Sequence, residues 1–240
     1  MRTAAVVLAG GSGKRMHADV PKQYMTLFGH PLLYYSLRAF EDSFIDEIVL
    51  VTAAGEEEHC RTEIVEKYDF AKVTAIVPGG KERYHSVMQG VKAVSTEADY
   101  IFIHDGARPF ITQEILEHVL TDVQEKQACV VGMPVKDTIK IADADGAVAD
   151  TPKRALVWQV QTPQVFSADL IRRAYGQLEK EEAELLARGV EITDDAMIVE
   201  LLTKQKVYLS QGSYENIKIT TPEDMGYAEW ILGKRSAESS

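Results

Sequence analysis

The sequence of 240 residues is poor in cysteine and contains no long hydrophobic run. The two cysteines, Cys60 and Cys129, lack both a CxxC partner and the spacing of metal ligands, which argues against a disulfide framework and a cysteine metal site. No apolar run approaches the roughly 20 residues of a membrane helix, and the first residues lead directly into an apolar strand rather than a signal peptide. We therefore expect reduced thiols, a cytoplasmic location and no membrane partner.

The sequence is also poor in positive charge. It has 26 Lys and Arg residues and 37 Asp and Glu residues, which gives a formal net charge of −11. Binding to nucleic acids or to anionic membrane surfaces relies on net positive surface charge, so neither is expected as a partner. An anionic small molecule has to meet a local basic cluster instead. The first such cluster is residues 8–24, LAGGSGKRMHADVPKQY, which combine glycines with basic side chains after an apolar run.

The apolar segments of the chain alternate between two patterns. Short runs rich in β-branched residues alternate with segments of helical spacing, which predicts a mostly parallel, twisted sheet of the Rossmann-like α/β class. Length favours a single domain over residues 1–240, with two domains as the alternative. The predicted strands are residues 4–9, 45–52, 73–77, 100–104 and 128–135, and the predicted helices lie around residues 33–40, 64–68, 87–94 and 115–123.

The strand and helix alternation stops after Val135. Polar and apolar residues then alternate around Asp145-Gly146, a hairpin-turn signal, and predict a protruding β-arm over about residues 136–162. An exposed hairpin with an apolar edge suits a dimer better than a monomer, so we expect a homodimer formed through this arm. The segments predicted beyond the arm are helices at 167–187 and 194–204, strands near 206–210 and 215–220, and a closing helix from residue 222.

The glycines after the first predicted strand place backbone N–H groups where they can surround phosphate oxygens. A Walker A loop needs glycine at position 8 and Ser or Thr at position 15, where Leu8 and Arg15 stand. A dinucleotide fingerprint needs glycine or alanine at position 16, where Met16 stands. The remaining hypothesis is a glycine loop that holds a triphosphate between Arg15 and Lys22, and the alternative is a flexible, solvated basic loop.

The segments GSGKRM (11–16) and PKQY (21–24) resemble the nucleotidyltransferases that join CTP to sugar-alcohol phosphates. The chain is most similar to the 2-C-methyl-D-erythritol 4-phosphate cytidylyltransferase family, and the likeness runs nearly from end to end. Other segments resemble family motifs in the expected order, namely GGKERYHSVMQG (79–90), HDGARPF (104–110), PVKDTIK (134–140), QTPQVF (161–166), TDDAMIVE (193–200) and NIKITTPEDM (216–225).

The resemblance implies an activity and a set of site residues. The phosphate of 2-C-methyl-D-erythritol 4-phosphate would attack the α-phosphorus of CTP, release pyrophosphate and form 4-diphosphocytidyl-2-C-methyl-D-erythritol for isoprenoid precursor synthesis. The implied cofactor is Mg²⁺, held by the CTP phosphates, with Asp105 as a candidate ligand. The implied catalytic residues are Arg15, Lys22 and Lys218; the CTP-binding residues are Ala9, Gly10, Gly11, Gly13, Gly80, Ser86, Asp105 and Gly106; and the substrate-binding residues are Asp105, Arg108, Thr138, Arg154 and Thr162.

Several of these residues also fit a structural role. Asp105 and Arg108 follow the fourth predicted strand, at the sheet edge where ligands collect, but a local pair that closes a turn gives the same pattern. Lys218 alternates with two isoleucines in a predicted strand and would also suit an edge strand that resists aggregation. The Asp194-Asp195 pair favours a helix N-terminus over a metal site. Arg83 fits either a structural or a surface role.

A phosphate monoester is already an anionic nucleophile at neutral pH, so the reaction requires no general base and the histidines are expected to be structural or solvent-facing. Two rival functions stay open. One is a ribitol-5-phosphate cytidylyltransferase, and the other is a non-catalytic CTP-binding sensor that signals through its dimer. The presence of Arg15, Lys22 and Lys218 together disfavours the sensor.

Overall fold

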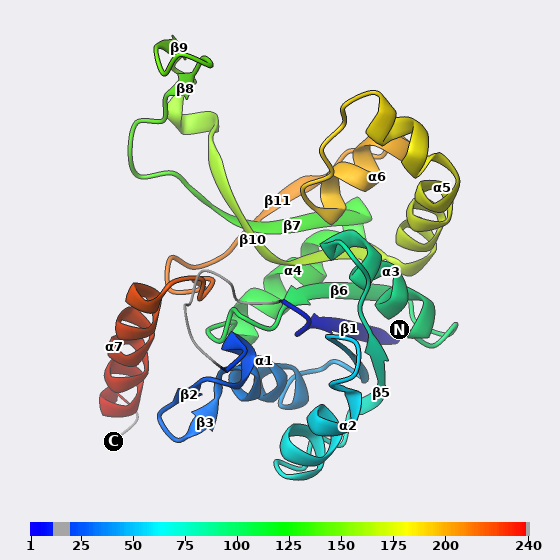
Figure 1. Ribbon diagram of the computed structural model, residues 1–240, viewed down its shortest axis with the longest axis vertical. Coiled ribbons are helices and arrows are strands. Elements are labelled where there is room, and N and C mark those ends of the chain that lie inside the picture. The colour runs from blue at the N-terminus through cyan, green and yellow to red at the C-terminus, as the bar shows by residue number, and fades with distance from the viewer. Residues whose placement is uncertain (12–19, 239–240) are drawn as a thin grey trace.

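The computed structural model describes residues 1–11 and 20–238 and is built around one large sheet (Figure 1). This sheet has seven strands in the order β11-β7-β10-β6-β1-β4-β5. The strands are β1 (Thr3–Leu8), β4 (Glu47–Thr52), β5 (Val73–Pro78), β6 (Tyr100–Asp105), β7 (Ala128–Pro134), β10 (Trp158–Ser167) and β11 (Tyr208–Gln211).

The sheet is parallel except at β10, which runs antiparallel to both β6 and β7. Every residue of β4 is buried, so its side chains show no alternation between polar and apolar types. This pattern arises where helices cover both faces of a sheet. The predicted mostly parallel α/β fold is therefore confirmed.

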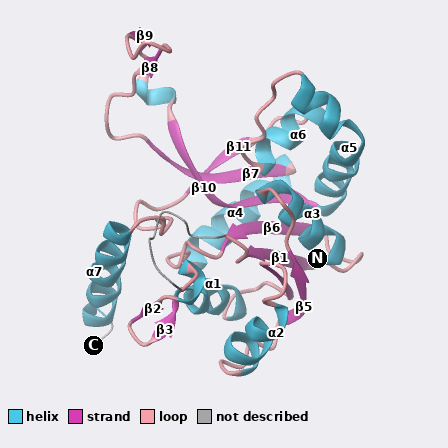
Figure 2. Ribbon diagram, in the orientation of Figure 1, coloured by secondary structure: helices cyan, strands magenta, loops and turns pink. Residues whose placement is uncertain are grey.

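Helices cover both faces of the sheet (Figure 2). One face is packed by α1 (Leu32–Glu41), α2 (Glu57–Cys60) with the π-helical turn Arg61–Glu66, and α4 (Gln113–Lys126). The other face is packed by α3 (Arg83–Ala93), α5 (Ala168–Ala187) and α6 (Asp195–Thr203). None of the helices in the described residues is both long and apolar enough for a membrane span.

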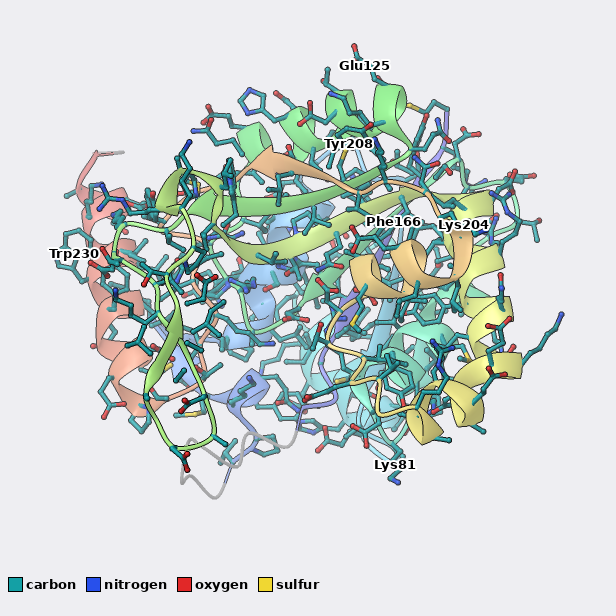
Figure 3. All side chains as sticks on the ribbon, turned by 90° about the horizontal axis from the view of Figure 1, so that it is seen from above. Lys81, Glu125, Phe166, Lys204, Tyr208 and Trp230 are labelled. Atoms are coloured by element: carbon teal, nitrogen blue, oxygen red, sulfur yellow. The ribbon has the colours of Figure 1, made fainter. Side chains whose placement is uncertain are left out.

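A smaller layer joins the two ends of the chain. The hairpin of β2 (Thr26–Leu27) and β3 (His30–Pro31) packs with α7 (Pro222–Glu238) around a separate apolar cluster that includes Leu27, Phe110 and Ile219. Seen from above, Phe166 lies within the helix-covered sheet, whereas Trp230 projects outward from α7 (Figure 3). The cluster fixes the segment before α7 against the one-turn helix Lys22–Tyr24.

The predicted arm is present and projects from the body of the molecule (Figure 1). Its tip is the antiparallel hairpin of β8 (Ile141–Ala142) and β9 (Val148–Asp150), which turns at Gly146 with a φ of +85°. The predicted boundary of 162 is wrong, because Trp158–Val160 already pair with β7 and Thr162 is buried in the sheet. The arm therefore ends near residue 157.

The predicted strand at 215–220 is also wrong. In the structure these residues form a turn followed by irregular backbone, with no sheet pairing. The Ile219 amide donates to the Ala107 carbonyl at 2.8 Å, and the Ile219 side chain is fully buried. Apolar burial and this hydrogen bond hold the segment in place without a strand ladder.

Candidate active site

A cavity of about 360 Å³ lies at the carboxyl ends of β1 and β6. This is the edge at which open α/β sheets bind ligands, because several loops meet there. Its lining comes from five parts of the chain, namely Leu8, Ala9, Gly10 and Gly11 at the end of β1, Lys22 and Gln23 in the one-turn helix, Gly80, Lys81, Glu82, Arg83 and Ser86 around the start of α3, Asp105 and Ala107 at the end of β6, and Lys218.

The carboxylate of Asp105 is paired with two cations. Its Oδ1 accepts from Arg83 Nε at 3.2 Å, and its Oδ2 accepts from Lys218 Nζ at 2.6 Å. The side chain of Asp105 is only 10% exposed, so these contacts are poorly screened by water. Burial alone raises the pKa of Asp105, but Arg83 and Lys218 outweigh it and hold that pKa well below its ordinary value.

Arg83 links this carboxylate to a second, deeper one. Its Nη1 donates to Asp195 Oδ2 at 2.8 Å, and Tyr175 Oη donates to the other oxygen of Asp195 at 2.5 Å. Asp195 is fully buried at the start of α6. Burial lowers the pKa of Arg83, but the two carboxylates raise it above its ordinary value, so its charge is permanent.

The second lysine of the cavity approaches from the opposite end of the chain. Lys22 Nζ donates to the Ile219 carbonyl at 3.1 Å, one residue beyond Lys218. On its other side the same turn is tied to α2, because Tyr24 Oη contacts the Glu56 carboxylate at 2.8 Å. Lys22 and Lys218 therefore line the same cavity, while their catalytic roles stay a prediction.

A glycine lies in the part of the cavity wall around the start of α3. A Cβ on Gly80 would stand 2.3 Å from the Cβ of His85, so a larger residue cannot be accommodated there without moving α3. The Gly80 amide donates to Ser86 Oγ at 3.1 Å, and Ser86 lies in the first turn of α3. Glycine backbone and one hydroxyl thus form part of this wall beside charged side chains, and nucleotide binding by this segment stays a prediction.

His104 lies behind the cavity and is fully buried. Its Nε2 contacts the Arg108 carbonyl at 3.1 Å, and its Nδ1 contacts Thr162 Oγ1 at 3.1 Å. Burial lowers the pKa of His104 to about 4. The ring is therefore neutral at pH 7 and joins the turn after β6 to strand β10, in agreement with its predicted structural role.

The lowered pKa of His104 predicts acid sensitivity. Between its unfolded value of about 6.5 and its folded value of about 4, only the unfolded chain binds the proton. The free energy of unfolding should therefore fall with falling pH, by up to about 1.4 kcal/mol per pH unit from this group. The free energy of unfolding, measured with urea between pH 7 and 4.5, should depend less steeply on pH in His104→Asn than in wild type. The control His118→Asn, on the exposed face of α4, should keep the wild-type pH dependence. Equal slopes for all three proteins would contradict this assignment.

Comparison with known proteins identifies the family. The profile of the family 2-C-methyl-D-erythritol 4-phosphate cytidylyltransferase, named IspD, matches residues 3–234. The chain belongs to this family. It is 54% identical over 229 residues to the 2-C-methyl-D-erythritol 4-phosphate cytidylyltransferase of Lachnospira eligens, a match that covers 95% of this chain and 98% of that relative. The corresponding protein of Lachnoclostridium phytofermentans is 48% identical, with 96% of each chain covered.

Solved structures of IspD proteins share the fold. The 4-diphosphocytidyl-2C-methyl-D-erythritol synthase of Anaerococcus prevotii superposes with a TM-score of 0.81 at 33% identity, covering 97% of this chain and 96% of that one. The 2-C-methyl-D-erythritol 4-phosphate cytidylyltransferase of Thermus thermophilus has a TM-score of 0.74 at 28% identity, covering 95% and 97%. The chain is accordingly a cytidylyltransferase, an enzyme of the nucleotidyltransferase class.

Most residues expected for CTP and catalysis in an IspD enzyme lie at the cavity. Gly106 is buried directly behind it, with its amide bonded to the Leu8 carbonyl at 2.9 Å. Gly13 and Arg15 lie outside the described residues. The predicted residues that line the cavity are Ala9, Gly10, Gly11, Lys22, Gly80, Ser86, Asp105 and Lys218.

The residues expected for the second substrate are placed differently. Thr162 is buried beneath Asp105, whose backbone amide donates to its hydroxyl at 3.1 Å. Arg108 donates to the Asn216 carbonyl at 2.8 Å and so holds the segment that carries Lys218. Among the described residues, the cavity lining includes neither of these side chains. Thr138 and Arg154 lie on the exposed arm.

Arg83 is a cavity residue that is absent from the predicted site residues. The sequence predicts a structural or a surface role for it, but it lines the cavity and joins two buried carboxylates. The signal available in the sequence is its place in the first turn of the helix that follows Gly79-Gly80. The partner Asp195 lies 112 residues away, and only the fold brings the two together.

Proposed function

We propose that the chain transfers the cytidylyl group of CTP to 2-C-methyl-D-erythritol 4-phosphate, with release of pyrophosphate. The observation that carries this proposal is the convergence of Lys22, Arg83 and Lys218 on one glycine-walled cavity in a chain of the IspD family. The site of action we propose is the cytoplasm, as suits a chain whose Cys60 and Cys129 are buried free thiols.

The cavity supports this reaction through electrostatics. The attacking phosphate is anionic at neutral pH, so a general base is not needed, and the neutral His104 agrees with this view. Charge builds on the α-phosphate during in-line displacement, and Lys22 and Lys218 supply fixed positive charge there. Asp105 holds Lys218 in place through its 2.6 Å contact, which reduces the reorganisation needed in the transition state.

The cofactor we propose is Mg²⁺, which would neutralise the triphosphate and its leaving group. In the described part of the chain, no group of three or more His, Cys, Asp or Glu side chains is arranged to hold a metal ion. Both oxygens of Asp105 already contact cations. Mg²⁺ commonly binds one or two carboxylates together with substrate phosphates, so we propose that CTP supplies most of its ligands, with Asp105 as the candidate from the protein.

The activity can be tested by pyrophosphate release from CTP, UTP, ATP and GTP with a panel of sugar-alcohol phosphates and Mg²⁺. We expect turnover with CTP and 2-C-methyl-D-erythritol 4-phosphate to exceed that of every other pair. Preference for ribitol 5-phosphate would assign the rival cytidylyltransferase activity. Nucleotide binding without pyrophosphate release under any acceptor would support the sensor.

A homodimer is the assembly that we propose for the arm. The arm exposes four large apolar side chains, with Leu156 76% exposed, Val148 60%, Ile141 50% and Ile139 36%. Apolar surface on a projecting hairpin is unfavourable in water and is covered when two copies pair. In such a dimer the arm residues Thr138 and Arg154 would reach the second substrate at the neighbouring subunit.

The dimer proposal predicts the effect of a charge on the arm. Leu156→Asp would bury a carboxylate in the interface, so we expect monomers where the wild-type chain sediments as a dimer at the same concentration. The matched control is Leu186→Asp, a half-exposed leucine on α5 away from the arm, which should leave the dimer intact. A wild-type monomer, or equal sedimentation of Leu156→Asp and wild type, would refute an arm-mediated dimer.

A further inference from the structure

His85 lies directly behind the part of the cavity wall at the start of α3. Among the described residues, the cavity lining does not include His85 itself, but it includes the residues around it in the chain, namely Gly80, Lys81, Glu82, Arg83 and Ser86. Gly80 packs against His85, because a Cβ on Gly80 would stand 2.3 Å from the Cβ of His85. His85 is therefore placed to hold this wall from behind.

Both ring nitrogens of His85 have a partner. Nδ1 accepts a hydrogen bond from the Glu82 amide at 3.2 Å, and because an amide can only donate, the proton of the neutral ring is on Nε2. Nε2 lies 2.9 Å from Glu182 Oε1 on α5. The carboxylate of Glu182 thus favours the tautomer in which Nδ1 can accept. Through this ring, the backbone of the cavity wall is connected to a helix on the far side of α3.

The contact is a helix cap in which a histidine has an unusual place. Glu82 and His85 form a capping box at the start of α3, and His85 stands where Glu or Gln is usual. Glycine leaves the backbone before Glu82 with more freedom than other residues allow. A ring held by a second helix restricts this backbone more than a flexible capping side chain would.

We propose that His85 is a positioning residue for CTP binding. Its ring holds the backbone of Gly80–Glu82 in the conformation that receives the nucleotide, and Glu182 holds the ring. Without this contact, the bound nucleotide has to order the wall itself, and that cost appears as lost affinity. The inference rests on the proposed function and adds to it a residue that lies outside the cavity lining.

Tyr84 provides a matched contrast, because it bonds to the same carboxylate. Its hydroxyl donates to Glu182 Oε1 at 2.8 Å, and its buried side chain belongs to the apolar cluster that α3 and α5 share. This bond joins the two helices without contacting the backbone of the wall. Loss of the Tyr84 hydroxyl should therefore affect stability alone, whereas loss of the His85 acceptor should affect CTP binding.

The test compares His85→Asn with His85→Leu in the full-length chain. Asn and Leu have nearly the same shape, but only Asn keeps an acceptor in the place of Nδ1. We measure the Kd of CTP by calorimetry, kcat and the KM of both substrates, and the melting temperature. His85→Leu should lose about tenfold in the Kd and KM of CTP, with kcat and the KM of the sugar-alcohol phosphate near wild type. His85→Asn should keep CTP affinity within about threefold of wild type.

Two further variants separate positioning from general stability. Tyr84→Phe should keep the wild-type Kd of CTP, whatever its melting temperature. Glu182→Met should weaken CTP binding in the wild-type background, because the ring is then able to adopt the other tautomer. The same change should have no further effect in the His85→Asn background, since the asparagine side chain is too short to reach α5.

Equal CTP affinities of His85→Asn and His85→Leu, whether both are kept or both are lost, would overturn the inference. If His85→Leu does not fold, the Glu182→Met pair decides, and equal losses in the two backgrounds would overturn the inference as well. A wild-type chain that binds CTP and releases pyrophosphate keeps the proposed function in either case. Failure of the proposed function would appear in that wild-type chain itself, as absent CTP binding or absent pyrophosphate release with every acceptor, and would remove the inference with it.

Discussion

Lys218→Ala is expected to lower kcat by on the order of 10²–10³-fold, the loss found when one preorganised donor to a developing anion is removed. Lys22→Ala should have an effect of the same order, since both lysines line the cavity. Their charge stabilises the transition state more than the bound substrates, so the loss should fall mainly on kcat. Single-turnover formation of the product from enzyme-bound CTP measures this step directly.

The matched control for these two variants is Lys92→Ala. Lys92 lies on α3, and its ion pair with Glu179 is half-exposed, so its removal should leave kcat near the wild-type value. Melting temperatures of all three variants separate loss of charge from loss of fold. Near-normal kcat in both Lys22→Ala and Lys218→Ala would exclude a catalytic role for the pair.

Local patterns in the sequence were sufficient to predict the sheet and most of its helices. β4 is recognisable because an unbroken apolar run is typical of a strand buried on both faces. Strand β10 is harder to predict from the sequence, because Gln161, Thr162 and Gln164 give it a polar composition. The structure buries these side chains by bonding them to distant loops, such as Gln161 to the Ser213 carbonyl at 2.7 Å. Long-range partners of this kind have no local signal.

Site residues that stand in sequence motifs could be predicted. Site residues that are defined by long-range ion pairs could not. Lys22 and Lys218 stand in recognisable segments, and their convergence follows from the family resemblance. The wrong strand around Lys218 arose because alternating apolar residues suit a strand, whereas Ile219 is buried in a satellite cluster instead. Arg83 depends on Asp105 and Asp195, whose approach is decided by the packing of α3 and α6 against α5 and the sheet.

The position of Arg83 between two buried carboxylates means that its loss should strongly destabilise the fold. Arg83→Met removes the guanidinium and leaves Asp195 buried beside Tyr175 without a counter-charge. Breaking a buried ion pair from one side costs about 3–5 kcal/mol, and we expect a decrease of this size in the free energy of unfolding at pH 7. Urea unfolding measures it. Arg188→Met, whose pair with Glu184 is exposed, should change stability by less than about 1 kcal/mol.

The pH dependence of this effect separates lost charge from lost packing. The cations lower the pKa of Asp105, so their stabilisation is present above its unfolded value near 4 and is lost as the pH falls toward the lowered folded value. The difference in the free energy of unfolding between wild type and Arg83→Met should therefore become smaller at acidic pH. The double variant Arg83→Met/Asp195→Asn should recover part of the loss at pH 7, because it removes the uncompensated charge. If this difference in the free energy of unfolding is independent of pH and unchanged by Asp195→Asn, Arg83 acts by packing alone.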